Sequence, residues 1–256
     1  TDNLFFMTQT MAGVAPMQPS VLIPYGDRLC YITTTTDVLG NSIGCVYISN
    51  RNNYQQITPD RHMVLLPGQL GITTGFVLRG VLYLLGPSWT FSTHDTGDYP
   101  TEWPLPQLVD SRRGTNAPQG VALSPTGNYA WVANEGGLWL FDGTGYPQLP
   151  ISYFNSDWSR INWAYAAQVQ VLDDPAAKRV YVTAPLDAAT TPSHMLVFDY
   201  TRGMSHDKVL FSLDTVGGSY ALGSMALVQN DLVGTAAANA KHPEMWLGSS
   251  GAGSLL

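Results

Sequence analysis

A repeated phrase of turn and strand constrains the fold of this chain most strongly. Its clearest copy is a Ser-Pro-Thr-Gly-Asn turn at residues 124–128, which leads into an apolar strand at 129–133 and, after two glycines, a second strand at 138–142. Similar phrases, each with a Trp or Tyr in the strand, return about every 40 residues, and this period in a chain of short strands is typical of propeller blades. The repeat therefore predicts a β-propeller.

The same pattern predicts the fold class in more detail: all-β, a β-propeller of four-stranded antiparallel blades, incomplete in this chain. Only residues 153–166 leave room for a helical turn or two. A β-sandwich, which also has many short strands, is the alternative that the turn spacing disfavours. The predicted divisions are an arm or the end of a preceding blade at 1–19, a connector at 60–69, and blades at 20–59, 71–109, 116–151, 161–214 and 220–256.

Charge is scarce in this chain and mainly negative. Charged residues make up 12% of the 256 residues, and the formal net charge is −7. This argues against a main function in gripping nucleic-acid phosphates. An acidic wall along which DNA slides stays open, because like charges prevent tight binding. A surface so poor in charge is either rich in Thr, Ser, Asn and Gln or buried against partner subunits, and the second arrangement indicates an assembly.

The two cysteines, Cys30 and Cys45, flank a turn-like segment and could lie opposite each other on paired strands. We expect free, buried thiols, since Cys is among the most buried residue types. Two cysteines support no disulfide framework. Neither their spacing nor the placement of the histidines suggests a metal site.

The apolar runs of the chain are short. The longest, such as residues 80–86, are far too short to span a bilayer, and no signal peptide is recognisable. We therefore expect no membrane segment. The chain starts with Thr1, and the blade pattern is unfinished at Leu256. We expect both ends to be cut, or the chain to be part of a larger protein.

A turn of the Asp-box type, Ser/Thr-x-Asp-x-Gly, occurs at Thr93, Asp95 and Gly97, with Trp103 beyond it. In such a turn the carboxylate accepts hydrogen bonds from nearby backbone N–H groups, and the glycine takes a positive φ. The turn recurs in sialidases and in other propellers, so it marks architecture. We predict a structural role for these four residues.

No set of residues is fixed by a motif into a catalytic arrangement. A sialidase-like glycosidase needs clustered arginines and a tyrosine nucleophile, and a retaining glycosidase needs two close carboxylates; no motif gathers either set. The Gly-Ser-Ser-Gly run at 248–251 lacks the spacing of a nucleophile elbow, and the five histidines are dispersed. No phosphate-binding loop occurs. We predict no catalytic residue, no metal and no cofactor.

The tryptophans raise a second interpretation, the binding of carbohydrate, because sugar rings stack on exposed aromatic faces. Trp158 and Trp163, with Trp103, lie near turns and are the candidates for surface contact with a glycan or receptor. Three other tryptophans sit in strand patterns and are expected in the blade core: Trp131, Trp139 and Trp246.

Residues 116–200 carry a more specific series of words. In order they are Ala-Pro-Gln-Gly-Val-Ala (117–122), Gly-Leu-Trp-Leu-Phe-Asp-Gly (137–143), Trp-Ser-Arg-Ile-Asn-Trp (158–163), Asp-Asp-Pro (173–175), Lys-Arg-Val-Tyr-Val (178–182), Ala-Pro-Leu (184–186), Ala-Thr-Thr-Pro (189–192) and Met-Leu-Val-Phe-Asp-Tyr (195–200). This series resembles the propeller-bearing structural proteins of tailed-phage virions. The rest of the chain is similar to them only through its blade pattern.

The resemblance implies a non-enzymatic virion protein, a nozzle or hub in the tail of a short-tailed phage. Its copies form an oligomeric ring around the DNA channel, with other tail or portal proteins as neighbours and DNA passing through without specific binding. The family has no catalytic residues to carry over. The alternative is a glycan- or receptor-binding propeller, as an adhesin or an extracellular lectin-like module. A propeller glycosidase is the third interpretation.

Overall fold

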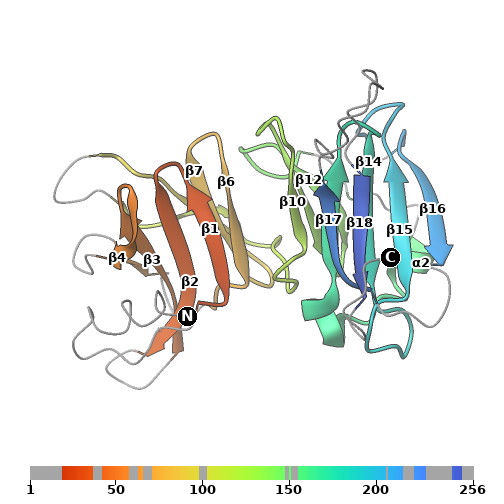
Figure 1. Cartoon of the computed structure of the whole chain (residues 1–256), viewed down its shortest axis with the longest axis horizontal. Coiled ribbons are helices and arrows are strands. Elements are labelled where there is room, and N and C mark those ends of the chain that lie inside the picture. Colours follow the sequence, from red (N-terminus) through yellow and green to blue (C-terminus); the bar gives the residue numbers. More distant parts are fainter. Residues whose placement is uncertain are drawn as a thin grey trace, which may run out of the picture. The chain divides into compact units, whose positions relative to one another are not determined.

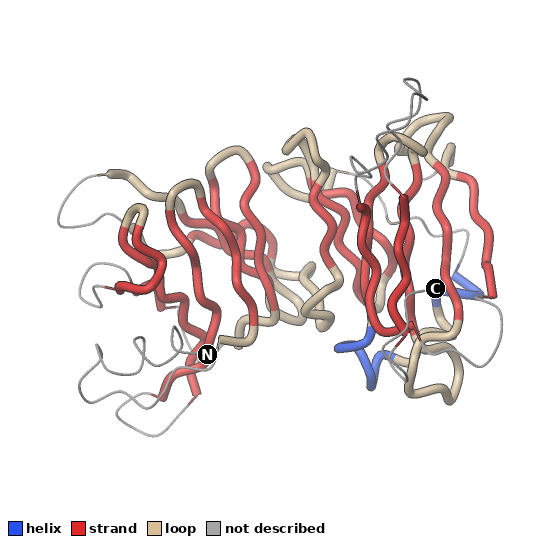
Figure 2. The backbone as a smooth tube through the Cα atoms, viewed as in Figure 1, coloured by secondary structure: helices blue, strands red, loops and turns tan. Residues whose placement is uncertain are grey.

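A computed structural model describes residues 19–36, 42–57, 63–65, 71–97, 103–147, 150, 155–205, 207–215, 222–228 and 244–249. They belong to two compact units, Thr1–Thr115 and Asn116–Leu256. Figure 2 shows strands joined by loops in both units, and helical turns in the second unit. None of the helices in the described ranges is long and apolar enough to cross a bilayer.

The first unit contains two antiparallel sheets, which we call the first and second blades. The first blade pairs its strands in the order β1-β2-β3-β4, with β5 also paired to β3, and the second in the order β6-β7-β8-β9. The strands are β1 (Val21–Tyr25), β2 (Arg28–Thr36), β3 (Ser42–Asn50), β4 (Asn53–Ile57), β5 (Met63–Leu65), β6 (Thr74–Leu78), β7 (Val81–Leu85), β8 (Thr90–Thr93) and β9 (Gln107–Asp110).

The second unit contains the third, fourth and fifth blades, with strand orders β10-β11-β12, β13-β14-β15-β16 and β17-β18. A short helix and a 3-10 helix lie between the third and fourth blades: α2 (Asn155–Trp158) and η1 (Trp163–Gln168). The strands are β10 (Val121–Leu123), β11 (Ala130–Asn134), β12 (Gly137–Phe141), β13 (Gln170–Asp174), β14 (Arg179–Ala184), β15 (His194–Asp199), β16 (Leu210–Thr215), β17 (Leu222–Val228) and β18 (Glu244–Ser249).

Within each unit, consecutive sheets stack as propeller blades do. Apart from β5, which pairs with β3, each sheet is an antiparallel meander in chain order. The first strand of one sheet contacts the first strand of the next: β1 contacts β6, β10 contacts β13, and β13 contacts β17. The neighbouring positions of β1 and β6 can be followed in Figure 1. The predicted all-β fold of four-stranded antiparallel blades is confirmed, with all four strands present in the second and fourth blades.

A two-residue turn sets the register between β6 and β7. The Arg79-Gly80 pair connects β6 to β7, and both residues have positive φ, 52° and 77°. That is the backbone of a two-residue type I′ hairpin, whose twist matches that of the flanking strands. The turn places Leu78 opposite Val81.

Some expected boundaries differ from the structure. The connector predicted at 60–69 contains β5, which pairs with β3. The helical turns expected at 153–166 are present, but η1 continues to Gln168. The arm or blade end expected at 1–19 lies outside the described residues except for residue 19.

Apolar side chains fill the space between stacked blades. Between the first and second blades, the buried cluster includes Ile32, Ile48, Leu82 and Leu84. Between the third and fourth blades, a larger cluster gathers residues of β11, β14 and β15 together with residues of α2 and η1. Burying one Val, Leu or Ile side chain contributes about 1.5–3 kcal/mol, so these interfaces supply the main stabilisation of the blade stack.

The two cysteines are free and buried, as the sequence predicted. Cys30 pairs with Ile48 and Cys45 with Thr33 on adjacent strands. Positions 30 and 33 face opposite sides of a strand, because side chains alternate with a period of two. The thiols therefore point to opposite faces of the sheet and do not lie opposite each other. Burial raises the pKa of both thiols to about 12, so the reactive thiolate is scarce at neutral pH.

Candidate functional site

The Asp-box-like turn has the local geometry expected of it. The Asp95 carboxylate accepts a hydrogen bond from the Gly97 N–H at 2.8 Å, and Gly97 has a φ of 72°. The Thr93 hydroxyl, at the end of β8, donates to the Pro104 carbonyl at 2.9 Å. Trp103 is buried in the core between the first and second blades. The four residues thus close one end of the second blade.

Asp95 also holds two arginines, which the sequence did not indicate. Its Oδ2 lies 3.2 Å from Nε of Arg28 and 3.1 Å from Nη2 of Arg51. The Arg28 side chain is only 2% exposed, whereas that of Arg51 is 54% exposed. Nη1 of Arg28 donates to the Ser49 carbonyl at 3.0 Å. A turn of the second blade therefore neutralises a buried cation of the first blade, which ties the two blades together.

Tyr25 and Trp103 complete this junction. Their rings meet edge to face, with centroids 5.0 Å apart. The Tyr25 hydroxyl donates to the Gly80 carbonyl and accepts from the Asp95 N–H at 3.1 Å. Burial raises the pKa of Tyr25, so the phenol stays neutral. The ring of Trp103 is committed to the junction and offers no open face for stacking a sugar.

Trp158 does not lie at the surface. It ends α2, is 2% exposed, and its Nε1 donates to the Asn134 carbonyl at 2.8 Å. Its ring packs edge-on against Phe198 of β15 at 6.0 Å. Trp163 is half-buried, with its ring centroid 6.1 Å from that of Trp158. The expectation of an exposed contact is wrong for Trp158, because α2 folds its tryptophan onto the core.

The three tryptophans expected in the blade core differ in their exposure. Trp131 is buried and Trp139 is half-buried, but Trp246 is 39% exposed. Trp246 pairs with Ala226 across the β17–β18 hairpin, whereas the methionines on the alternate positions, Met225 and Met245, pack on the fourth blade. The expectation of a core position is wrong for Trp246, because it stands on the other face of the fifth blade.

A second polar cluster, which sequence reasoning missed, lies between the third and fourth blades. The buried carboxylate of Asp173 accepts hydrogen bonds from the Tyr200 hydroxyl at 2.8 Å and the Tyr129 hydroxyl at 3.1 Å. The two hydroxyls are 3.4 Å apart. Burial raises the pKa of all three groups. The sequence contains only a weak indication of it: two adjacent acidic residues, Asp173 and Asp174, at the end of β13.

This cluster predicts a specific dependence of stability on pH. Burial raises the pKa of Asp173, so between the unfolded value, about 3.9, and the raised value the folded state binds more protons. The free energy of unfolding falls as pH rises through that window. Asp173→Asn keeps an oxygen acceptor and removes the titration. Measured by urea unfolding, the stability of this variant relative to wild type should rise from pH 3.5 to pH 7.

The informative quantity is the difference in the free energy of unfolding between variant and wild type. Asp142, Asp187 and Asp199 have lowered pKa values, so they make stability rise with pH, and they do so equally in both proteins. Each unit of pKa elevation corresponds to about 1.4 kcal/mol of this difference. A difference that stays constant over the pH range would mean that Asp173 is no more costly to ionise in the folded protein than in the unfolded one.

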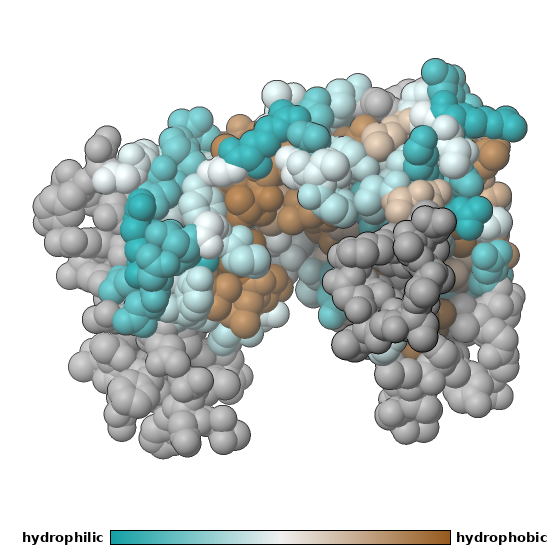
Figure 3. All heavy atoms as spheres, turned by 45° about the horizontal axis from the view of Figure 1, so that its top comes forward, coloured by the Kyte–Doolittle hydropathy of each residue, from teal (hydrophilic) through white to brown (hydrophobic). Residues whose placement is uncertain are grey.

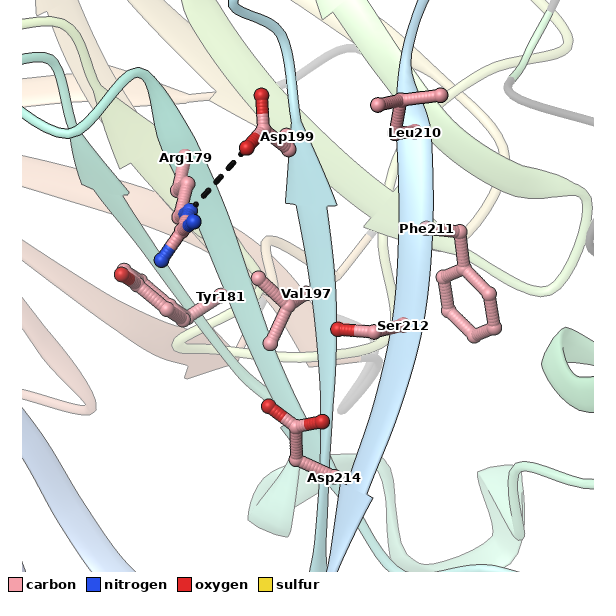
Figure 4. A pocket seen from close by; sticks show the side chains of 8 residues that line it. All are labelled: Arg179, Tyr181, Val197, Asp199, Leu210, Phe211, Ser212 and Asp214. Carbon is pink, nitrogen blue, oxygen red and sulfur yellow. Dashed lines mark hydrogen bonds and ion pairs between the residues drawn. The ribbon is translucent and has the colours of Figure 1, made fainter.

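The outer part of the fourth blade carries a hollow of about 380 Å³ (Figure 4). Its floor includes Tyr181 and Val197, and Arg179 pairs with Asp199 at 3.3 Å at one end. The hydrogen bonds that Arg179 donates to Tyr181 and Asp199 raise the pKa of Arg179. The carboxylate of Asp214 stands at the other end (Figure 4). The full lining is Arg179, Tyr181, Val197, Asp199, Leu210, Phe211, Ser212 and Asp214.

A second hollow, of about 410 Å³, lies at the turn that follows β9 and is lined by Val109, Asp110, Ser111, Arg112 and Arg113. Asp110 organises the turn. One of its oxygens accepts the backbone N–H groups of Arg112 and Arg113 at 2.7 and 2.9 Å. Its other oxygen lies 3.5 Å from the Arg113 guanidinium.

Neither hollow contains, among the described residues, a set of side chains that could hold a metal ion. Across the described ranges, no three His, Cys, Asp or Glu residues gather in a way that could hold a metal ion. The hollow of the fourth blade offers paired and single charges above an apolar floor, an arrangement suited to a polar partner with an apolar patch.

No protein-family model matches the chain, and no curated protein matches it. Among solved structures, the chain is similar to the β-propeller domain of the Trilobed protease from Pyrococcus furiosus, which is described as having an open velcro topology. The sequence identity is 8%, the match covers 94% of this chain and 70% of that chain, and the TM-score is 0.44.

Proposed function

We propose that this chain is a non-enzymatic structural protein of a tailed-phage virion, a nozzle or hub component whose copies form a ring around the DNA channel. One observation carries the proposal: the ionisable residues that gather in polar clusters join one blade to the next. Asp95 is held by Arg28 and Arg51, and Asp173 by two tyrosine hydroxyls. These side chains bond to other residues of the same chain, and such bonds between blades make a scaffold more rigid.

The surface supports an assembly. In a chain with 12% charged residues, apolar side chains reach solvent, and Figure 3 shows brown, hydrophobic atoms at the surface among teal ones. Large apolar side chains on an otherwise polar surface often mark contacts with other proteins. The exposed ones in the described ranges are Leu22, Tyr54, Leu105, Leu108, Leu123, Tyr165, Leu210 and Trp246.

A ring around DNA also needs a wall that DNA does not bind. The chain has 19 acidic residues against 12 Lys and Arg. An acidic channel repels the phosphate backbone and lets it slide. We expect Asp and Glu to outnumber Lys and Arg on the channel face.

Electron microscopy of the purified chain tests the proposal. We expect closed rings with an open lumen, and no retention of duplex DNA at physiological salt. A chain that stays monomeric at high concentration, or a ring whose lumen is strongly positive, would contradict it. A glycan array separates the rival function, since saturable binding of a sugar would favour a receptor-binding propeller.

A further inference from the structure

We infer that copies of this chain contact one another head to tail, with the outer edge of the second blade of one copy docking in the hollow on the fourth blade of the next. The inference rests on the proposed ring and names the two surfaces that would build it. The docking edge consists of Leu105, β9 and the turn to Arg113. The receiving hollow is that of Figure 4.

The docking edge has the features of an unfilled interface. β9 is the last strand of its sheet, and within the described ranges only β8 pairs with it. A strand edge of this kind presents unpaired N–H and C=O groups and readily accepts a partner. Leu105 is 82% and Leu108 is 55% exposed. The edge therefore offers apolar side chains next to free backbone groups.

The receiving hollow has matching features. Leu210 of β16 is 46% exposed at its rim, and Tyr181 and Val197 form an apolar floor. β16 is likewise the last strand of its sheet. An apolar edge from another copy would cover the floor and the exposed leucine together. Interface cores of this type are apolar, with charges at the rim.

The charges of the two surfaces are complementary. In the hollow, Arg179 and Asp199 pair with each other, which leaves Asp214 and a net charge of −1. At the docking edge, Asp110 pairs with Arg113, which leaves Arg112 and a net charge of +1. In the described ranges no ion pair joins the side chain of Arg112 or Asp214 to another residue. Each is therefore available to the other across an interface.

The two surfaces are different, so one copy uses both at once. A contact between two unlike surfaces repeats from copy to copy, and it generates a ring when the rotation closes. The same residues thus explain how the copies would assemble, and they supply the charge pair that aligns them.

Charge reversal tests the contact in the whole chain. Arg112→Asp and Asp214→Arg each place like charges opposite each other, so each variant alone should raise the dissociation constant for self-association at least about tenfold, or ~1.4 kcal/mol. An equimolar mixture should regain wild-type assembly, because the acidic edge of one variant meets the basic hollow of the other. Analytical ultracentrifugation measures all of these states.

Two matched variants control for the change of charge. Arg79→Asp gives the same change as Arg112→Asp and creates an Asp-Gly pair, which suits the existing type I′ turn. Glu135→Arg matches Asp214→Arg in the exposed turn between β11 and β12. Both should assemble as wild type does. Normal assembly of Arg112→Asp and Asp214→Arg, or failure of their mixture to recover, overturns this contact while the ring stands. A wild-type chain that never associates overturns both.

Discussion

Replacing Asp95 with alanine is expected to lower the free energy of unfolding of the first unit by about 3–5 kcal/mol, because it removes a carboxylate that lies against a buried cation. The Arg28 side chain is 2% exposed, and its Nε lies 3.2 Å from Oδ2 of Asp95. The loss is a large share of the 5–15 kcal/mol by which folded domains are typically stable. Differential scanning calorimetry should show the transition of this unit about 12–20 °C lower.

Arg51→Ala provides the matched control. It removes the other partner of Asp95, but from an exposed position, where an ion pair contributes about 0–1 kcal/mol. The double variant Arg28→Met, Asp95→Ala should recover much of the lost stability, since apolar replacement of a buried pair is often neutral. Equal losses of stability in Asp95→Ala and Arg51→Ala would mean that the ion pair between Asp95 and the buried Arg28 adds nothing to the stability of the unit.

The sequence was sufficient for features that depend on local patterns. The Arg79-Gly80 turn and its flanking strands are fixed by neighbours in the chain, since a two-residue loop with positive φ at both positions admits few alternatives. The Asp-box geometry at Asp95 and Gly97 is local in the same way. Blade recurrence follows from turns at regular intervals, so the fold class was predictable without any tertiary information.

The contacts between blades could not be predicted, because they join residues far apart in the chain. Nothing near Arg28 indicates that its counterion is Asp95, and nothing near Asp173 indicates that Tyr129 will reach it. A strand pattern also gives no information on which face of a blade is covered by the next one. That is why Trp246 was expected in the core, although it is exposed.

Trp158 is a core residue in a segment whose sequence resembles a turn. Its neighbours in the segment Asn155 to Ser159 are polar, and Trp158 was expected near a turn, as a candidate for surface contact. They form one turn of helix, and that turn has an inner side. The tryptophan lies on the inner side, over Phe198, while Asp157 pairs with Arg160 outside at 3.0 Å. Only the packing of α2 on the fourth blade distinguishes this arrangement from an exposed loop.

Replacing Trp158 with alanine is expected to lower the free energy of unfolding of the second unit by about 3–5 kcal/mol, the usual cost of removing a large buried aromatic side chain. The variant also leaves the Asn134 carbonyl without the donor that now lies at 2.8 Å. Trp158→Phe separates the two effects: it keeps most of the packing, and its loss should be nearer the 1–3 kcal/mol of an unsatisfied buried group. Urea unfolding followed by circular dichroism measures both.

Trp246→Ala is the appropriate comparison, since it deletes the same side chain from a position that is 39% exposed. Its effect on stability should be much smaller, about 1 kcal/mol or less, because a partly exposed residue leaves no enclosed cavity behind. The comparison also tests the carbohydrate interpretation for Trp158. If Trp158→Ala folded with wild-type stability and lost binding on a glycan array, Trp158 would act as a contact residue at the surface, and its assignment to the core between the third and fourth blades would be wrong.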